Sequence, residues 1–453
     1  MVMHLSYFNS VLKSSVLGAI LALGTLSASA SLVISGNNRP AIEVQSPASS
    51  GLDAVYVIYD MSSATVSYTA QSQTVTWYRY GSRGGGFAEE VTGISRQGNV
   101  YSIKPGSDDL GYIIDDGTRR TCYWLVNYES HRLELSGLTV DAVNSDCSTT
   151  ILSASGNGDA IIYYSVNGRG IELNRELSLM YRTLTYDEGQ AAWIQGETSQ
   201  VVSHLGAHIT VPAPLCDTDF RLEGDRFLRQ WDESQSITTD LYQAIAVSAV
   251  TTADQQQRDV DNESRPEVSS LGGSAPCTIT FSACPTDAAI FREWQFSNTE
   301  SFEDVLDRFS QDVLEYTFAD QGTVYVRYVC GNAEGTCFYE GDVYSVMVGE
   351  SKLEIPNAFS PINQDGVNDV WKVSYTSIVS FECHIFNRWG TKICTLTSPS
   401  QGWDGKYNGK IVQPGVYFYV IKAVGADGVK YNKSGDINIL DSRRKAGGET
   451  SVE

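Results

Sequence analysis

The chain has 453 residues, enough for three or four domains, and its hydrophobic content of 42% is ordinary for globular proteins. The formal charge of −22 argues against binding to nucleic acid or to anionic membranes, because both repel an acidic surface. The charge is uneven: residues 351–440 hold nine Lys or Arg against seven Asp or Glu, for +2, whereas residues 31–350 carry −25. This shift near residue 350 indicates a domain boundary.

The first 30 residues have the three parts of a secretory signal peptide. Lys13 supplies a positive charge, and "VLGAILALGTL" follows as an apolar core too short to span a bilayer. Ala28 and Ala30 offer small residues to a signal peptidase, so the mature chain is predicted to begin near Ser31. No later apolar run approaches the roughly 20 residues of a membrane helix. We therefore expect no transmembrane segment in the mature chain.

Short segments rich in β-branched and aromatic residues, separated by Gly, Asn, Asp and Ser, predict an all-β protein built of tandem Ig-like β-sandwiches. The clearest predicted strands are residues 54–60, 64–70, 74–80, 121–128, 160–166 and 323–329. Alternation favours Trp77 and Trp124 as core residues, although such aromatic strands would also suit stacking on sugar rings. Residues 301–309 are the one segment with a helical pattern, of two turns.

Composition and turn signals also divide the chain into domains. The predicted order is a signal peptide (1–30), a β-sandwich (31–142), a second β-sandwich (143–250), a linker or long loop (251–276), a third β-sandwich (277–350), a small C-terminal β-sandwich (351–440) and a disordered tail (441–453).

Nine cysteines in an exported chain predict disulfides, and the odd number leaves at least one cysteine unpaired within the chain. Cys330 and Cys337 flank a Gly/Asn turn, so they are candidates to close a hairpin. Cys383 and Cys394 lie symmetrically about Arg388 and Trp389 and are candidates to face each other across another hairpin. Cys122–Cys147 is a further candidate pair. The absence of a CxxC spacing argues against a structural zinc site.

The third predicted sandwich has a more specific pattern. "TITFSA" (278–283), "REWQFS" (292–297) and "YTFADQGTVYVRYV" (316–329) follow one another in this order. The succession resembles Ig-like domains of the polycystic-kidney-disease type over about residues 277–350, with "SNTES" in place of the Gly-Asp-Gly that follows Trp-X-Phe in that family. The resemblance implies a sandwich, and strand alternation places Trp294 and Phe296 on one core-facing side.

The C-terminal region contains, in order, "IPNAFSPINQDGVNDVWKV", "FECHIFNRWGTKI", "GWDGKYNGK", "QPGVYFYVIKA" and "KSGDINIL". Over residues 351–440 it closely resembles the gliding-motility-associated C-terminal domain, the type B sorting domain of type IX secretion. The resemblance implies that the outer-membrane type IX machinery handles the chain and delivers it across the outer membrane to the cell surface or beyond. It assigns the sorting motif to Asn357, Phe359, Ser360, Pro361, Asp365, Gly366, Asn368, Asp369, Asn387, Arg388, Trp389, Gly390, Gly402, Trp403, Asp404, Gly405, Gly415, Tyr417 and Gly435.

The residues of this region also indicate a small sandwich. Pro414–Gly415 predicts a turn into "VYFYVI", which is apolar on both faces, so we expect a central strand covered on each side. Trp389 and Trp403 are large apolar residues beside glycines, an arrangement typical of the edge of a core.

Asn363, Asp365, Asn368 and Asp369 carry hard oxygen ligands and are candidates to bind Ca²⁺. An EF-hand alignment fails, because it places Pro361 at the first ligand position and Lys372 at the position of the bidentate Glu. The alternative is that Asp and Asn bond their own backbone in a tight turn, and we favour it over the metal. We expect no other cofactor.

Catalytic motifs are scarce, since the chain has neither a G-x-S-x-G elbow nor a P-loop. We expect a non-enzymatic surface or secreted protein whose N-terminal modules act in adhesion or in binding a glycan or protein ligand. One alternative is a secreted hydrolase with an acidic pair in the first two domains, which requires carboxylates about 5–10 Å apart in a cleft. Another is a structural component of the surface or secretion machinery, which would expose an extensive apolar patch.

Overall fold

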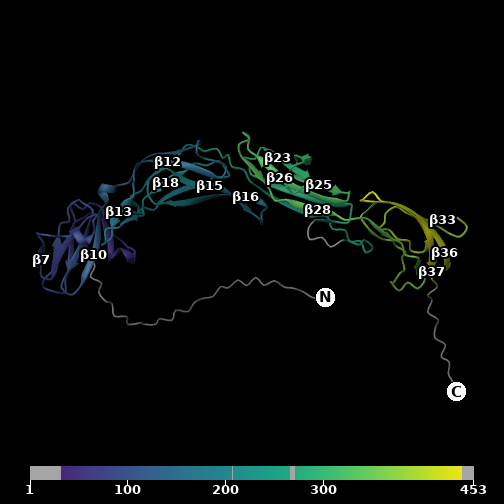
Figure 1. Cartoon of the computed structure of the whole chain (residues 1–453), viewed down its shortest axis with the longest axis horizontal. Coiled ribbons are helices and arrows are strands. Elements are labelled where there is room, and N and C mark those ends of the chain that lie inside the picture. Colours follow the sequence, from purple (N-terminus) through teal and green to yellow (C-terminus); the bar gives the residue numbers. More distant parts are fainter. Residues whose placement is uncertain (1–31, 207, 266–270, 441–453) are drawn as a thin grey trace, which may run out of the picture. The chain divides into compact units, whose positions relative to one another are not determined.

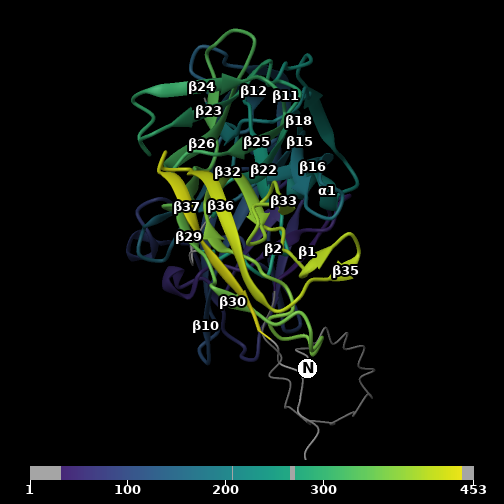
Figure 2. The ribbon, with the colours of Figure 1, turned by 90° about the vertical axis from the view of Figure 1, so that its right-hand side faces the viewer.

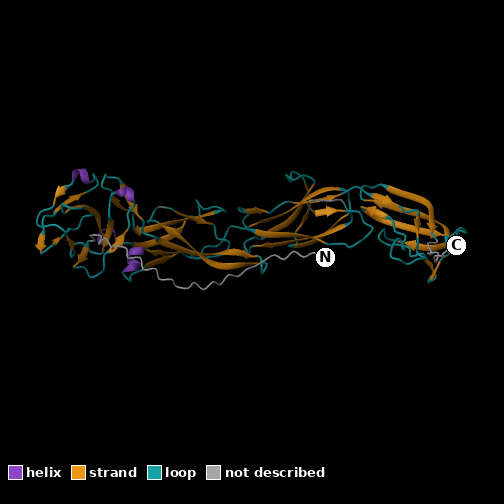
Figure 3. Ribbon diagram, turned by 90° about the horizontal axis from the view of Figure 1, so that it is seen from below, coloured by secondary structure: helices purple, strands orange, loops and turns teal. Residues whose placement is uncertain are grey.

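The computed structural model describes residues 32–206, 208–265 and 271–440 (Figure 1). The predicted signal peptide and tail lie outside these residues. In the described part the chain forms 37 strands, three short 3-10 helices and one five-residue α-helix, α1 (Arg226–Gln230) (Figure 3). The all-β prediction is confirmed. Within these ranges no helix is long and apolar enough to cross a membrane.

Contacts divide the chain into two compact units. Of the described residues, the first unit contains 32–132 together with Ala160–Leu173 and Gln230–Asp232, and the second contains Leu133–Asp159, Asn174–Arg229 and 233–440. The hairpin at 160–173 thus belongs to the first unit, although the sequence-based boundary at residue 142 grouped it with the second domain.

The first unit is a sandwich of two sheets. One sheet has the strand order β1 (Val33–Ser35), β4 (Thr65–Thr69), β8 (Val100–Ile103), β7 (Ser95–Gln97), and the other has the order β2 (Ile42–Val44), β3 (Ala54–Ile58), β10 (Arg120–Asn127), β9 (Leu110–Asp115), β5 (Thr76–Tyr80), β6 (Glu89–Glu90). Trp77 is fully buried between the sheets, with its ring edge-on to Tyr68 and Tyr112. The predicted strands of this region are confirmed.

The hairpin β13 (Ile161–Tyr164) and β14 (Gly170–Leu173) covers the other face of β10. Its Tyr164 ring lies 5.6 Å from the ring of Trp124, which is 1% exposed. At the hairpin turn, the Val166 carbonyl accepts the Gly85 N–H at 2.7 Å, and the Val166 N–H donates to the Ser50 carbonyl at 2.9 Å. The prediction that Trp77 and Trp124 are core residues is confirmed, but Trp124 is covered by a hairpin from later in the chain.

The second unit begins with a sandwich that we call the second sandwich. Its sheets have the strand orders β11 (Glu134–Val140), β12 (Thr149–Asn157), β17 (Ile209–Pro212) and β16 (Ala192–Val202), β15 (Leu177–Asp187), β18 (Arg221–Gly224), β19 (Gln235–Thr238). Arg175 and Asp225 form an ion pair of 2.8 Å in which both side chains are buried. The second carboxylate oxygen of Asp225 accepts the Leu228 N–H at 3.0 Å, so the pair also anchors α1.

The third sandwich follows. Its sheets have the orders β20 (Ala249–Gln255), β22 (Cys277–Pro285), β25 (Val313–Phe318) and β21 (Leu271–Gly273), β28 (Tyr344–Val348), β26 (Gly322–Gly331), β23 (Phe291–Ser297), β24 (Val305–Phe309), with β27 (Phe338–Glu340) added to β26. Trp294 and Phe296 are buried in one core against Phe281, as their alternation predicted.

Two sequence-based predictions fail in this sandwich. Residues 301–309 are not helical, because two turns are too short to be stable alone, and β24 instead pairs with β23 and packs Phe309 on Phe296 at 5.1 Å. The stretch 251–276 is only partly a linker, because it contains most of β20 and all of β21. β20 lies at the edge of its sheet, where only alternate residues meet the core, so its polar composition resembles that of a loop.

The terminal sandwich has a five-stranded sheet in the order β30 (Ala358–Phe359), β37 (Lys430–Ile439), β36 (Gly415–Gly425), β32 (Ile378–Phe386), β33 (Lys392–Leu396) (Figure 2). The pair β29 (Lys352–Glu354) and β31 (Ser374–Thr376) and the hairpin β34 (Lys406–Tyr407), β35 (Lys410–Ile411) complete it. β36 is central, as predicted, but only one of its faces is covered. Val416, Phe418 and Val420 are 45%, 44% and 42% exposed on the open face.

Candidate functional site

Two tryptophans form the centre of the terminal sandwich. Trp371 and Trp403 are buried and exchange two backbone hydrogen bonds, each 2.9 Å long. The indole N–H of Trp371 donates to the Pro356 carbonyl at 2.7 Å, and that of Trp403 donates to the Lys406 carbonyl at 3.0 Å. The pair therefore fastens both the N-terminal segment of the sandwich and the β34–β35 hairpin.

The neighbouring motif residues pack around Trp403. The rings of Phe359 and Tyr417 each lie 5.3 Å from its ring. Gly405 has a φ of +72°, and a Cβ there would come within 2.6 Å of Pro361; a Cβ on Gly402 would come within 2.4 Å of Val370. The sequence thus brings six motif residues into one cluster in which the glycines permit close packing.

Other motif residues hold the five-stranded sheet together. The Asn357 carbonyl accepts the Asn438 N–H at 2.8 Å where β30 meets β37. Gly435 lies opposite Tyr419, whose ring occupies the place of a Cβ. Gly415, with a φ of +145°, begins β36. Asn357, Gly415 and Gly435 therefore have structural roles in this sheet.

Residues 360–369 form what we call the Asn/Asp loop. It is closed by the Ser360 N–H, which donates to the Asn368 carbonyl at 2.8 Å. Asp365 accepts the Val367 N–H at 3.0 Å, and Asp369 accepts the Gly366 N–H at 2.8 Å. The side-chain amide of Asn363 donates to Asp365 at 2.8 Å. The backbone bonds of the favoured turn interpretation are therefore present.

The same loop keeps two oxygens without a donor. The Oδ1 atoms of Asn363 and Asp369 are buried and receive no hydrogen bond from any described residue. Within the described part of the chain, no group of three or more His, Cys, Asp or Glu is placed to hold a metal ion. Calcium binding through Asn363, Asp365, Asn368 and Asp369 stays a prediction.

The hairpin between β32 and β33 projects from the sheet. The Asn387 side chain accepts the N–H groups of Trp389 and Thr391 at 3.0 and 2.9 Å, and Gly390 has a φ of +82°. The Arg388 guanidinium lies 4.2 Å from the centre of the Trp389 ring, which is 73% exposed. The prediction that Trp389 lies at the edge of the core is wrong, because no strand of the sandwich packs opposite this tip.

Asp404 belongs to the same end of the sandwich as Trp403. Its carboxylate accepts the Lys406 ammonium at 2.7 Å and the Lys406 backbone N–H at 3.1 Å. The Lys406 side chain lowers the pKa of Asp404 below its ordinary value. Its contribution to stability is therefore present at neutral pH and lost in acid.

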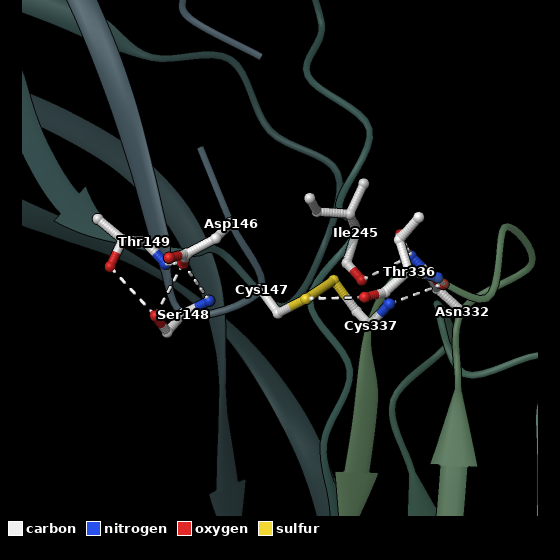
Figure 4. The surroundings of a disulfide bond; sticks show 8 residues. All are labelled: Asp146, Cys147, Ser148, Thr149, Ile245, Asn332, Thr336 and Cys337. Carbon is white, nitrogen blue, oxygen red and sulfur yellow. Dashed lines mark hydrogen bonds between the residues drawn. A yellow bond between two sulfur atoms is a disulfide. The ribbon is translucent and has the colours of Figure 1, made fainter. Parts of the chain in front are cut away.

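A disulfide joins the second and third sandwiches (Figure 4). Cys147 lies in the turn between β11 and β12, and Cys337 follows the turn of residues 332–336; their Cα atoms are 5.4 Å apart. Asn332 supports this turn by accepting the N–H groups of Thr336 and Cys337, and its amide donates to the Ile245 carbonyl at 3.3 Å. The other seven cysteines are thiols.

All three predicted pairings are absent. Cys337 is bonded to Cys147, so neither Cys330–Cys337 nor Cys122–Cys147 forms. Cys330 in β26 lies opposite Tyr339 in β27, and its side chain is part of the core of the third sandwich. Cys383 lies opposite Leu396, two positions away from Cys394 in the register of β32 and β33, so the pair is diagonal rather than facing.

A cleft of about 720 Å³ lies beside this disulfide, between the second and third sandwiches. This volume is within the range of sites that hold small ligands. Among the described residues that line it, none is Lys or Arg, and three are carboxylates. The lining includes Trp193, Cys216, Asp217, Asp287, Asn332 and Glu334. The cleft therefore suits a neutral hydroxylated or a cationic ligand.

Trp193 forms one side of the cleft and is held in place. Its indole N–H donates to the Cys284 carbonyl of the third sandwich at 2.9 Å, and its ring lies edge-on to Tyr186 at 5.4 Å.

Burial raises the pKa of the Cys216 thiol, and the carboxylates of Asp217 and Asp287 raise it further. Since the thiolate is the nucleophilic form, Cys216 is poorly suited to nucleophilic chemistry.

Comparison with known proteins assigns families to two of these sandwiches. Residues 353–439 match the family model of the CHU_C type IX secretion signal domain, and residues 139–239 match that of the fibronectin type III domain. The predicted sorting domain is confirmed. The match indicates export across the outer membrane to the cell surface or the extracellular space, and handling by the type IX machinery.

No curated protein matches the sequence. Among solved structures, a tetra-tandem repeat from the extending region of a large adhesion protein is 11% identical, with a TM-score of 0.21 over 84% of this chain and 97% of that one. The FN1–FN3 domains of chicken CNTN1 are 10% identical, with a TM-score of 0.23 over 67% and 98%. Three N-terminal domains of the Hoc capsid protein of bacteriophage RB49 are 10% identical, with a TM-score of 0.20 over 68% and 100%.

Proposed function

We propose that this exported chain is a non-enzymatic adhesion or ligand-binding protein, and that the cleft between the second and third sandwiches holds its ligand. The terminal sandwich supplies the export address, so the residues before it are the passenger. The observation that carries the proposal is the cleft itself. A tryptophan fixed by a hydrogen bond, three carboxylates and three side-chain amides line one cavity of ligand size.

The chemistry of the lining favours a glycan. Sugar hydroxyls donate well to carboxylates, and a tryptophan ring offers an apolar face for a sugar ring. Lysine or arginine side chains of a protein ligand would also be attracted, because the described lining residues include no cation to compete with them. The disulfide beside the cleft supports a preformed site, which reduces the entropy lost on binding.

A glycan array probed with the purified mature chain tests the proposal. We expect retention of a defined set of glycans, and about tenfold or more weaker binding by Glu334→Ala, since hydrogen bonds to charged groups contribute about 1.5–3 kcal/mol. Glu303→Ala is the matched control, because Glu303 is an exposed acid of the same sandwich outside the cleft.

The alternatives give different results in the same experiment. Release of cleaved sugar from a retained glycan would favour the hydrolase hypothesis. Retention that Glu334→Ala leaves unchanged would overturn the assignment to the cleft. A chain that binds neither glycans nor cell-surface proteins, but associates with the export machinery after delivery, would favour a structural role.

A further inference from the structure

The segment that connects β20 and β21 of the third sandwich contacts the terminal sandwich. Residues 258–265, which we call the clasp, lie about ninety residues before the region that matches the secretion signal family. The Ser264 N–H donates to the Tyr375 carbonyl at 2.8 Å, and the Tyr375 N–H donates to the Asn262 carbonyl at 3.1 Å. The clasp therefore pairs with β31 in parallel on the edge that β29 leaves open.

Side chains on both partners reinforce this pairing. The Asn262 amide donates to two carbonyls of the terminal sandwich, those of Val373 at 2.7 Å and Pro399 at 2.8 Å. Thr376 donates its hydroxyl proton to the Ser264 carbonyl at 2.7 Å. Lys372 and Asp261 form an exposed ion pair at 2.8 Å. These side-chain contacts add to the two backbone bonds that join the clasp to the terminal sandwich.

The clasp is also ordered internally. The Glu263 side chain is fully buried between Arg258, at 2.7 Å, and Arg265, at 3.3 Å. Arg258 further donates to the Ser274 carbonyl at 2.8 Å. Val260 packs against the core of the terminal sandwich. A buried carboxylate with two guanidinium partners is costly to leave half-paired, so the clasp is held in one conformation.

Beyond the clasp, the chain touches the terminal sandwich a second time. The Ser274 hydroxyl oxygen accepts the Ser377 N–H at 2.8 Å, and the Ala275 N–H donates to the Ser377 hydroxyl at 3.2 Å. These bonds lie directly between β31 and β32. Both ends of the region from 258 to 275 are therefore anchored to the sheet edge that would otherwise be an open template for strand pairing.

We propose that the export address of this chain is composite, and that the clasp is part of it. The segment adds one parallel β-bridge, Glu263 to Tyr375, beside β31, so the surface presented to the export machinery is complete only when residues 258–265 are bound there. The unit that the machinery recognises then extends from the clasp to the end of β37. This deepens the proposed function and rests on its export premise.

The test uses the full chain in its native bacterium and as purified protein. Asn262→Ala removes two part-buried hydrogen bonds, to the Val373 and Pro399 carbonyls, so we expect about tenfold faster amide exchange at Ser264 and Tyr375. We also expect a several-fold drop in the fraction of chain delivered across the outer membrane. Thr376→Val removes the hydroxyl that donates to the Ser264 carbonyl, with little change in side-chain volume. It should likewise speed amide exchange and lower delivery.

Asp259→Ala is the matched control, because Asp259 lies in the clasp but is exposed and makes no contact used above. It should change neither exchange nor delivery. Faster exchange with unchanged delivery would show that the clasp is not part of the address, and unchanged exchange would show that it does not hold the sheet. Deletion of residues 351–440 tests the premise that the terminal sandwich is needed for export. If the shortened chain is still delivered, the terminal sandwich is not the address.

Discussion

The second unit joins its sandwiches in two different ways. The second and third sandwiches are tied by the Cys147–Cys337 disulfide, which closes a loop of 190 residues. The third and terminal sandwiches are tied by the clasp, whose contacts are hydrogen bonds, ion pairs and one packed valine. We expect the disulfide to respond to reductant, and the clasp to respond to pH and to substitution of its polar groups.

The two ties differ in what lies next to the covalent bond and what lies next to the non-covalent contacts. The covalent tie lies beside the cleft, where a fixed geometry favours binding. The polar tie lies beside the secretion signal domain and holds no covalent bond. Hydrogen bonds of this kind each contribute about 1 kcal/mol, so several act together to hold the clasp, yet each can be removed singly.

The largest expected effect comes from removing the covalent tie. In Cys147→Ala/Cys337→Ala we expect a loss of about 2–5 kcal/mol in the free energy of unfolding, because a long loop is released in the unfolded chain. Denaturant titration of the oxidised mature chain measures it, and Cys216→Ala, which removes an unpaired thiol, is the control. An unchanged midpoint in the double variant would mean that non-covalent contacts alone hold these sandwiches together.

A smaller effect is expected from the polar tie. Arg258→Ala leaves the buried Glu263 carboxylate with Arg265 alone, so we expect a local loss of about 1–3 kcal/mol at the clasp. Amide exchange at Ser264 reports it, and the Cys147–Cys337 tie should be unaffected. If the loss at Ser264 is matched by an equal loss throughout the second sandwich, the two ties are not independent.

Acid should weaken the clasp and leave the Cys147–Cys337 disulfide unchanged. The hydrogen bond from Lys372 lowers the pKa of Asp261 below its ordinary value, so this contact stabilises the clasp above the unfolded pKa of about 3.9. The contribution is lost as pH falls through the lower, folded value. We expect clasp exchange to accelerate below about pH 4 while the disulfide stays closed. Asp261→Asn should remove the part of the pH dependence of clasp amide exchange that comes from this ion pair. If the pH dependence of exchange is unchanged in this variant, other groups cause the acid sensitivity.

Much of the fold was predictable because its signals are local. β3, β5, β10 and β26 are runs of five to ten residues rich in β-branched and aromatic side chains, and the predicted strands were found there. The packing around Trp403 was also marked in the sequence, since its glycines lie within two residues of it. Trp371 was overlooked as the partner of Trp403, although it stands within the first quoted motif of that region.

The remaining features depend on partners that are distant in the sequence. Trp389 and Trp403 both stand beside glycines, but only Trp403 meets Phe359 and Tyr417. Cys147 and Cys337 are 190 residues apart, and no local spacing indicates their pairing. The clasp reads as a polar linker because its partners are backbone carbonyls more than a hundred residues later. The cleft was missed for the same reason, since two sandwiches build it.

The Asn/Asp loop gives the smallest expected effect, and it belongs to neither tie. If the turn interpretation holds, Asp365→Ala loses the exposed bonds from the Val367 N–H and from the Asn363 side-chain amide and costs about 0.5–1.5 kcal/mol, equally with calcium and with chelator. Thermal unfolding of the mature chain in both conditions measures it. The unpaired oxygens of Asn363 and Asp369 are the reason to make the comparison. A calcium-dependent rise in melting temperature that Asp365→Ala and Asp369→Asn both abolish, and that Asp261→Asn leaves intact, would instead establish a metal site in this loop.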